Sequence, residues 1–365
     1  MNEAGFWSGR RVLITGHMGF KGAWLTAQLD RAGAYTIGFG RDARPDPLLY
    51  RRLRFRNHLS IDADVNETDH LRATLVEQDT EIVFHLAAQP FVRASYGSPL
   101  GTVRDNALGT ASVLDAIRTA GGVRAAIIVT SDKVYDNREW VWPYRETDRL
   151  GGADPYSASK AAAEIITAAF RRSFFSGEGA TQVATVRAGN VIGGGDWGAD
   201  RLLPDAAIAF AKGSPLMIRN PRAVRPWQHV LDALAGYMLV ARKMIVDGYV
   251  AHPEWNFGPD RESALTVQEV ADLFCAAWGD GASWEALGDT RSDPHEAFLL
   301  GVDSSRAKSA LDWRPQWDVK QSITRTARWY RAFYEGADAE MLVDDDLRAF
   351  SVKGTAPLGD SGIQD

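Results

Sequence analysis

Two clusters of side chains in this sequence have types and spacing suited to acid–base chemistry. In the first, Tyr156 and Lys160 are four residues apart, so both project from one face of a helix. Pro155 suits the first position of that helix, where its missing N–H is harmless. An ammonium group lowers the pKa of a neighbouring phenol, so we expect Tyr156 to act as a base for a sugar or alcohol hydroxyl. The alternative is a surface tyrosine beside a solvated lysine.

The second cluster ends an apolar run, AIIV (126–129), which is followed directly by Thr130, Ser131, Asp132 and Lys133. A buried strand that ends beside a ligand would present a hydroxyl, a carboxylate and an ammonium group to it. The alternative is a turn at the end of a strand, in which Ser131 and Asp132 bond to the local backbone.

A glycine-rich loop follows the first apolar run, VLIT (12–15), and has the spacing GxxGxxG. Glycines allow a tight turn, a close approach of the backbone to a pyrophosphate and close packing of the next helix, whose N-terminus favours the anion. The alternative is a glycine-rich turn without a ligand. The loop residues that we expect to contact a dinucleotide are Gly16, Gly19, Phe20, Lys21 and Gly22.

The adenosine end of that dinucleotide has several candidate ligands in the sequence. An acid at the end of the second strand favours NAD, whereas an arginine can accept the 2′-phosphate of NADP. Arg41-Asp42 offers both, so we expect NAD and leave NADP open. Asp64 could bind the adenine amine, or could be an ordinary surface aspartate. The loop HLAAQP (85–90) suits either backbone contact with the cofactor or simple strand–helix packing, and its candidate residues are Leu86, Ala87 and Ala88.

Short apolar runs alternate with segments of helical spacing through the first half of the chain, which predicts a parallel sheet covered on both faces. The fold class is therefore α/β, a Rossmann-type doubly wound sheet with a smaller mixed α/β C-terminal substrate-binding domain. The expected strands are 12–15, 35–39, 81–88, 125–131 and 182–188, and the expected helices include 21–32, 106–120, 156–170, 230–246 and 265–278. We assign 1–188 with about 226–250 to the NAD-binding domain, 189–225 and 251–345 to the substrate-binding domain, and 346–365 to a mobile tail.

Composition excludes several other classes of protein. The formal charge of −6 and the pI of about 5.7 argue against nucleic-acid binding. No apolar run approaches the length that spans a membrane, so we expect no membrane partner. Cys275 is the single cysteine, and the seven histidines show no metal-ligand spacing, so we expect no disulfide within the chain and no metal. These features together favour a cytoplasmic protein.

Taken together, these residues resemble the extended short-chain dehydrogenase/reductase family, and within it the nucleotide-sugar 4,6-dehydratases. The resemblance covers Gly16 to about Glu296. The segments that carry it are GHMGFKGAWL, TSDKVYDNREWVWPYRETDRLGGADPYSASK, VRAGNVIGGGDW, IRNPRAVRPWQHV, WNFGP and DPHEA.

The resemblance implies a redox-neutral dehydration with NAD and, on resemblance alone, CDP-glucose as the substrate. Tyr156, with Lys160, would take the C4 hydroxyl proton while hydride passes from C4 to NAD⁺. Ser131 would bond the C4 oxygen, and Asp132 would be the acid for the departing C6 hydroxyl. Lys133 stands where sister enzymes have an acid, so it would act at C5 either as a base or by stabilising the enolate.

The same resemblance implies a set of substrate-binding residues and an assembly. Arg225 would clamp the diphosphate with its planar guanidinium group, whereas structural ion pairs are equally plausible for Arg201 and Arg219. A homodimer or homotetramer is expected. An NDP-sugar 4-epimerase and a non-catalytic dinucleotide-sensing protein are the alternative functions. The substrate-binding candidates are Gln89, Asn190, Arg201, Arg219, Arg225 and His295.

Overall fold

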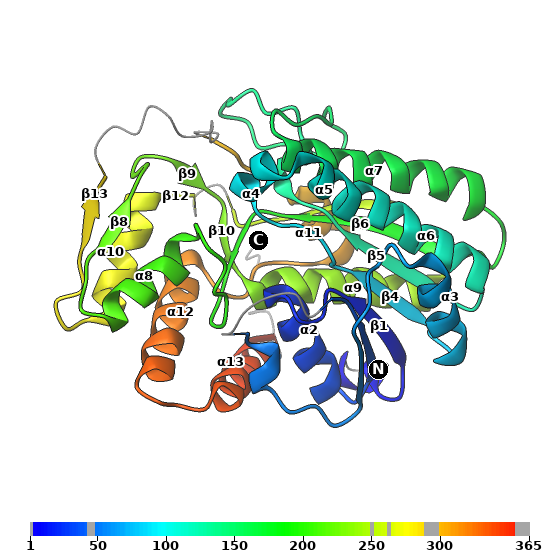
Figure 1. Cartoon of the computed structure of the whole chain (residues 1–365), viewed down its shortest axis with the longest axis horizontal. Coiled ribbons are helices and arrows are strands. Elements are labelled where there is room, and N and C mark those ends of the chain that lie inside the picture. Colours follow the sequence, from blue (N-terminus) through cyan, green and yellow to red (C-terminus); the bar gives the residue numbers. More distant parts are fainter. Residues whose placement is uncertain (1–2, 42–47, 249–251, 261–263, 288–298, 355–365) are drawn as a thin grey trace, which may run out of the picture.

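The computed structural model of the chain describes residues 3–41, 48–248, 252–260, 264–287 and 299–354. Its centre is a seven-stranded parallel sheet with the strand order β11-β6-β5-β4-β1-β2-β3 (Figure 1). The order reverses beside β1, as it does in a doubly wound Rossmann-type sheet, and the predicted fold class is confirmed. The strands are β1 (Arg11–Thr15), β2 (Tyr35–Phe39), β3 (His58–Ile61), β4 (Ile82–His85), β5 (Ala125–Val129), β6 (Gln182–Ala188) and β11 (Glu254–Phe257).

The central strands form from short runs rich in β-branched residues because both of their faces are covered. All the residues of β4 and β5 are buried, as is typical of parallel strands that lie between two layers of helices. β2 and β6 have the predicted bounds, whereas β4 ends at His85, short of the expected residue 88, and β5 ends at Val129, before Thr130 and Ser131. The side chains expected to do chemistry therefore begin where the strands stop.

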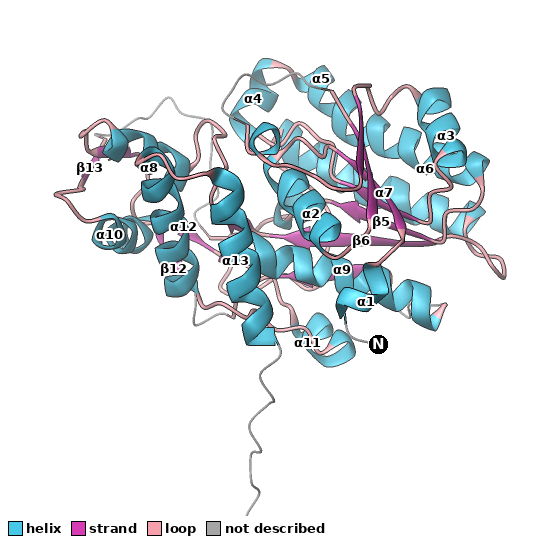
Figure 2. Cartoon of the chain, turned by 90° about the horizontal axis from the view of Figure 1, so that it is seen from below, coloured by secondary structure: helices cyan, strands magenta, loops and turns pink. Residues whose placement is uncertain are grey.

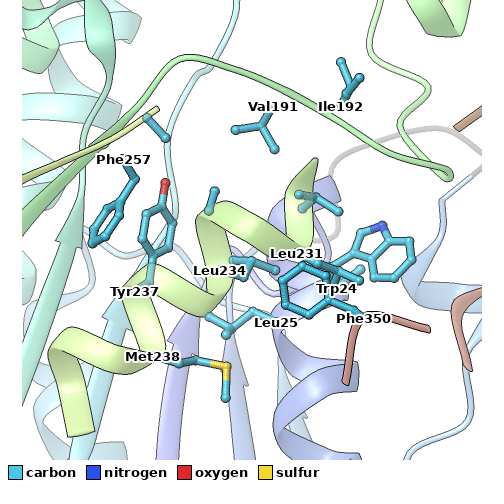
Figure 3. Close-up of a cluster of buried hydrophobic side chains, with 14 of the residues drawn as sticks. Trp24, Leu25, Val191, Ile192, Leu231, Leu234, Tyr237, Met238, Phe257 and Phe350 are labelled. Atoms are coloured by element: carbon cyan, nitrogen blue, oxygen red, sulfur yellow. The ribbon is translucent and has the colours of Figure 1, made fainter. Parts of the chain in front are cut away.

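Helices cover both faces of the sheet (Figure 2). On one face, α2 packs against α9, and Trp24 and Leu25 of α2 meet Leu231 and Leu234 of α9 in a buried cluster (Figure 3). On the other face, α6 packs between α3 and α7. The helices of this part are α1 (Glu3–Trp7), α2 (Phe20–Arg31), α3 (Thr68–Glu77), α4 (Val92–Gly97), α5 (Pro99–Val103), α6 (Gly109–Ala120), α7 (Pro155–Phe174) and α9 (Val230–Asp247), with short turns η1 (Tyr50–Arg52), η2 (Arg104–Leu108) and η3 (Asp132–Val134).

The rest of the chain builds a smaller mixed region in which three pairs of short strands lie among helices (Figure 1). Capping boxes at Thr266 and Asp318 fix the starts of α10 and α12, which pack together. We propose on this basis the substrate domain 189–225 and 251–345. The pairs are β7 (Asn190–Ile192) with β10 (Trp227–His229), β8 (Leu216–Ile218) with β13 (Trp284–Ala286) and β9 (Val224–Arg225) with β12 (Leu265–Thr266); the helices are α8 (Leu202–Ala211), α10 (Val267–Trp278), α11 (Ser305–Leu311) and α12 (Val319–Tyr334).

The expected tail from residue 346 is wrong over its first part. A further helix, α13 (Ala339–Gly354), continues through residues 346–354. Helix α13 packs against the rest of the protein because Val343 and Phe350 are buried, and the Phe350 ring packs on Trp317 with 5.3 Å between ring centroids. The helix contributes an apolar face that the flanking polar residues obscure in the sequence. Residues 355–365 lie outside the described part of the chain.

Candidate active site

A cleft of about 820 Å³ lies over the carboxyl ends of the central strands, where ligands bind in doubly wound sheets. It is lined by all the predicted site residues except His295, which lies outside the described residues. Those lining residues are Gly16, Gly19, Phe20, Lys21, Gly22, Arg41, Asp64, Leu86, Ala87, Ala88, Gln89, Ser131, Asp132, Lys133, Tyr156, Lys160, Asn190, Arg201, Arg219 and Arg225.

The glycine loop between β1 and α2 has no room for side chains at two of its glycines. Gly16 has a φ of +70°, and a Cβ there would lie 2.7 Å from the Ala87 nitrogen. A Cβ on Gly22 would lie 2.2 Å from the Gly16 carbonyl oxygen. The Thr15 hydroxyl accepts hydrogen bonds from Leu86 N and Ala87 N, both at 3.1 Å. Two backbone loops are thus held together at the start of α2, and this arrangement fits a dinucleotide phosphate at the helix N-terminus.

Lys21 lies in the first turn of α2 and adds a cation to this loop. Burial, aided by the charge of Arg201, lowers its pKa to about 8. The carboxylate of Asp132 acts in the opposite direction and raises the pKa. The glycine loop and the strand-end cluster (Ser131, Asp132 and Lys133) therefore face the same space.

Asp64 and Arg41, the adenosine-end candidates, form an ion pair of 3.3 Å. Burial alone would raise the pKa of Asp64, but hydrogen bonds from Asn66 and the guanidinium groups of Arg41 and Arg104 lower it. Arg41 also pairs with Asp105 at 3.1 Å. Both candidates line the cleft, so the structure leaves a carboxylate and a guanidinium group at one end of it. Asp42 lies outside the described residues.

The strand-end cluster turns into the cleft through the short helix η3. Asp132 is 1% exposed, and its Oδ1 accepts hydrogen bonds from Ser131 Oγ at 2.9 Å and from Lys133 Nζ at 3.2 Å. Ser131 Oγ in turn accepts a hydrogen bond from Lys133 N. The local bonding that we expected as the alternative does occur, and it holds all three side chains on the wall of the cleft.

Tyr156 and Lys160 share the face of α7 that borders the cleft. The helix starts at Pro155, and Asp154 caps it by accepting a hydrogen bond from Ser157 N at 2.9 Å. Both side chains are buried, Tyr156 at 7% and Lys160 at 6% exposure. The predicted one-sided placement of the pair is therefore present.

The electrostatics of this pair differ from the prediction. Burial raises the pKa of Tyr156 to about 12, although a hydrogen bond with Ser131 and the charge of Arg201 lower it. Burial and the charge of Lys21 lower the pKa of Lys160 to about 7. Burial of the phenol itself therefore outweighs the lowering that was expected from Lys160, whose side-chain nitrogen donates to the Val129 carbonyl at 3.2 Å.

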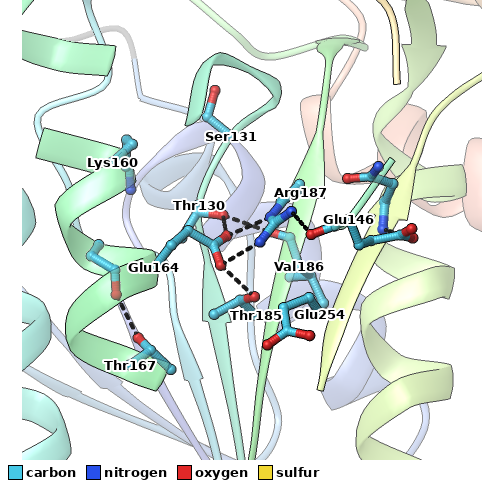
Figure 4. Close-up of polar contacts among 12 residues, drawn as sticks. Thr130, Ser131, Glu146, Lys160, Glu164, Thr167, Thr185, Val186, Arg187 and Glu254 are labelled. Carbon is cyan, nitrogen blue, oxygen red and sulfur yellow. Dashed lines mark hydrogen bonds and ion pairs between the residues drawn. The ribbon is translucent and has the colours of Figure 1, made fainter. Parts of the chain in front are cut away.

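A buried ion pair lies directly behind the site and was missed in the sequence (Figure 4). Glu164, one turn after Lys160, accepts two hydrogen bonds of 2.8 Å from Arg187 of β6, and each side chain is 2% exposed. Thr130 and Thr185 also donate to this carboxylate. The available signal was Arg187 itself, because a charged residue inside the apolar strand QVATVRA requires a buried partner.

The predicted diphosphate ligands all line the cleft. Arg201 contacts Asp196 at 3.4 Å, and Arg219 contacts Asp200 at 2.9 Å. Each arginine forms an ion pair and also lines the cleft, so the structural alternative is present and the substrate-binding role stays a prediction. Arg225 donates to the Val224 carbonyl at 2.9 Å. The spacing of residues in the sequence gave no sign that Asp196 and Asp200 pair with these arginines.

Gln89 and Asn190 complete the predicted substrate side. The Gln89 amide is held within its own loop, donating to Phe91 O and Thr102 Oγ1, both at 3.0 Å. Asn190 begins β7, and its backbone N–H donates to the Pro226 carbonyl. His229, the last residue of the segment RPWQH, is fully buried and caps α9.

The described residues contain no group of three His, Cys, Asp or Glu side chains that could hold a metal ion. A search of the same residues finds no helix with the length and apolar character needed to span a membrane.

A Rossmann-type sheet with a Tyr–Lys pair over its carboxyl edge defines a protein of the short-chain dehydrogenase/reductase class. The family model described as GDP-mannose 4,6 dehydratase matches residues 13–326, so this chain belongs to that family of nucleotide-sugar dehydratases. The resemblance seen in the sequence is confirmed.

Individual relatives agree with this assignment. The chain is 45% identical to CDP-glucose 4,6-dehydratase of Salmonella typhimurium, over 93% of this chain and 95% of the relative. MoeE5 in complex with UDP-glucose and NAD is 26% identical with a TM-score of 0.74, covering 88% of this chain and 99% of that one. DesIV, a dTDP-glucose 4,6-dehydratase of Streptomyces venezuelae with NAD bound, shares the fold at 24% identity and a TM-score of 0.72, covering 88% of this chain and 97% of that one.

Proposed function

We propose that this protein dehydrates CDP-D-glucose to CDP-4-keto-6-deoxy-D-glucose with NAD as a recycled cofactor. The observation that carries the proposal is the convergence of Ser131, Asp132, Lys133 and Tyr156 on one cleft that also contains the glycine loop. The relative from Salmonella typhimurium supports the cytidine nucleotide. The buried carboxyl of Asp132 distinguishes a dehydratase from a 4-epimerase, which needs no acid for a C6 hydroxyl.

When bound, the oxidised nicotinamide supplies a hydride acceptor and a positive charge that favours the phenolate form of Tyr156. Tyr156 then removes the proton of the C4 hydroxyl, and Ser131, which is hydrogen-bonded to the phenol, holds the C4 oxygen. Asp132 donates its proton to the C6 oxygen as water leaves. Lys133 acts at C5: in its amine form it takes the C5 proton, and the ammonium so formed stabilises the enolate.

The substrate nucleotide is proposed to lie against the second domain. Arg225 clamps the diphosphate, with Arg201 and Arg219 beside it, because guanidinium groups engage two phosphate oxygens at once. Support comes from their common position on the cleft wall. NAD is favoured over NADP because Arg41, the candidate for a 2′-phosphate, pairs with Asp64 and Asp105.

A substrate screen tests the proposal. CDP-, dTDP-, UDP- and GDP-glucose are each incubated with the protein and either NAD⁺ or NADP⁺, and the products are analysed by mass spectrometry. CDP-glucose with NAD⁺ should give a product lighter by one water, with no net formation of NADH. A product of unchanged mass would instead indicate epimerisation, and the absence of any product would refute the enzymatic assignment.

We also propose that the protein assembles as a homodimer or a homotetramer. Large apolar side chains are exposed on neighbouring helices of the sheet's outer layer, among them Leu100 at 84%, Leu108 at 54% and Ile165 at 60%. A second copy would cover such a face. Light scattering coupled to gel filtration tests this, and a Leu100→Arg variant should shift the mass towards the monomer.

A further inference from the structure

A set of buried polar side chains extends from the glycine loop to the helix that carries Tyr156. Each of them is 2% exposed or less, and none lines the cleft. Buried polar groups lose their hydration, so they require partners inside the protein. The set, which we call the buried network, consists of Thr15 of β1, His85 of β4, Thr110 of α6, Asn106 of η2 and Ser159 of α7.

His85 lies in the middle of the buried network, and its two ring nitrogens have different partners. Nδ1 lies 2.7 Å from Thr15 Oγ1, and Nε2 lies 3.2 Å from Thr110 Oγ1. The Thr15 hydroxyl already accepts hydrogen bonds from two backbone N–H groups of the loop after β4, so its own hydrogen is donated to Nδ1. Burial, aided by the charge of Lys160, lowers the pKa of His85 to about 3. The ring is therefore neutral, and its proton is on Nε2, which donates to Thr110.

The other half of the buried network ends at the helix of the Tyr–Lys pair. Thr110 donates to the Asn106 carbonyl at 2.7 Å. The Asn106 amide donates to Ser159 Oγ at 2.8 Å, and Ser159 donates to the Tyr156 carbonyl at 2.7 Å. The same amide group binds the backbone of Gln89, accepting from its N–H at 2.8 Å and donating to its carbonyl at 3.1 Å. Asn106 lies in a π-helical turn, a rare conformation that is frequent at functional sites.

The hydrogen bonds between members of the buried network all point in one direction, from Thr15 towards Tyr156. Both ends meet the cleft, since Gly16, which follows Thr15, and Tyr156 line it. We propose that His85 and Asn106 are positioning residues that hold the cofactor loop and Tyr156 at a fixed separation. This inference rests on the proposed function, in which both ends serve one reaction.

Oxidation at C4 is the step that depends on this separation. Tyr156 removes the hydroxyl proton while hydride leaves the same carbon for the nicotinamide, so the phenol and the cofactor must reach one atom. A misplacement of about 1 Å in such an arrangement costs about 10²-fold in rate. Binding of the substrate nucleotide does not use the buried network, because its proposed ligands Arg201 and Arg219 are held by Asp196 and Asp200 instead.

A Thr110→Val variant tests the proposal because it removes one hydroxyl, keeps the shape of the side chain and leaves the His85 Nε2–H without its acceptor. Calorimetric titration should show NAD⁺ binding weakened about tenfold and CDP binding within about twofold of the wild type. The kcat for dehydration should fall about tenfold or more. An NAD⁺ affinity or a kcat within about twofold of the wild type would overturn the proposal, and so would an equal loss of CDP binding.

Thr167→Val is the matched control. The Thr167 hydroxyl is also buried and donates to the carbonyl four residues earlier, that of Ala163, over the same 2.7 Å (Figure 4). It lies on the helix of Tyr156 but outside the buried network. We expect NAD⁺ binding, CDP binding and kcat to stay as in the wild type, and losses equal to those of Thr110→Val would contradict the proposal.

A double-mutant cycle distinguishes one network from separate structural contacts. Ser159→Ala removes the last link of the buried network, and Thr110 reaches Ser159 only through Asn106 among the members of the network. If the network acts as a unit, Ser159→Ala should lower kcat much less in the Thr110→Val background than in the wild type. Additive effects on kcat would overturn the proposed coupling.

A measurement on the wild-type protein tests the buried network without catalysis. With ¹⁵N-labelled histidine, NMR should show the His85 ring as the neutral Nε2–H tautomer throughout the range between about pH 5.5 and 8, with its signals assigned by their loss in His85→Gln. An Nδ1–H tautomer or a charged ring in this range would overturn the proposal. The two hypotheses fail separately. If the wild type forms no dehydrated sugar, the proposed function fails, and NAD⁺ binding and NMR still test the network; if it does and Thr110→Val behaves as the wild type, only the network fails.

Discussion

Replacing Glu164 by glutamine should destabilise this protein strongly, although the substitution keeps the size and shape of the side chain. Glu164 and Arg187 are each 2% exposed and share two hydrogen bonds of 2.8 Å. Burial alone would lower the pKa of Arg187, yet the charge of Glu164 holds it above its ordinary value. Because an arginine guanidinium stays protonated in proteins, Arg187 keeps its charge after the substitution and loses its counter-charge in the interior.

The size of the effect follows from that loss. Removing one partner of a buried ion pair typically destabilises a protein by about 3–5 kcal/mol, a large part of a total stability of about 5–15 kcal/mol. Removing both charges avoids the unpaired cation, so the double variant Glu164→Gln/Arg187→Met should recover about 2 kcal/mol or more of the loss. Some loss remains, because Tyr135 and the Glu146 carbonyl also bond to Arg187.

Urea unfolding followed by circular dichroism measures these free energies in the wild type, both single variants and the double variant. The double-mutant cycle then isolates the coupling between the two charges. Asp115→Asn is the matched control, because its pair with Arg118 is 39–42% exposed and should change stability by less than about 1 kcal/mol. A loss below about 1 kcal/mol in Glu164→Gln, or purely additive effects, would refute the reasoning.

Three further predictions concern the site and its supports. Tyr156→Phe should lower kcat/KM by about 10²–10⁴-fold with an unchanged urea midpoint, and a loss of less than tenfold would exclude Tyr156 as the base. Burial lowers the pKa of His85 from 6.5 to about 3, so the unfolded chain binds more protons than the folded protein below pH 6.5, and stability falls as the pH falls. The variant His85→Gln should therefore lose about 2 kcal/mol less stability than the wild type between pH 6.5 and 5. Equal losses in the two proteins would contradict this. Gly22→Ala forces a Cβ within 2.2 Å of the Gly16 carbonyl oxygen, so it should weaken NAD⁺ binding at least tenfold in a calorimetric titration. Gly177→Ala is the control, because no atom lies within 4 Å of its Cβ, and it should bind NAD⁺ as the wild type does.

Local patterns in the sequence were sufficient to predict those parts of the site that depend on neighbours along the chain. The apolar run before Ser131 became β5, and the Pro155 signal became the start of α7. Because parallel strands end at one edge of the sheet, the residues that follow them meet without any further information. That rule brought the glycine loop, the strand-end cluster and the Tyr–Lys pair into one cleft.

Properties that depend on burial could not be predicted in the same way. Spacing places Lys160 beside Tyr156, but the direction of a pKa shift depends on how much water and which other charges reach each group. Only the fold brings Lys21 close enough to lower the pKa of Lys160. The continuation of α13 into the expected tail has the same origin, since its buried residues are recognised by what they pack against.

Arg187 shows how such information can nevertheless be extracted from a sequence. An isolated charge in a buried strand must either leave the core or find a counter-charge within it. The carboxylate with the greatest chance of meeting it lies on a helix that covers the same strand, and Glu164 occupies the turn after Lys160. Had the helix been placed over β6 from the alternation of elements, the pair would have followed from charge balance alone.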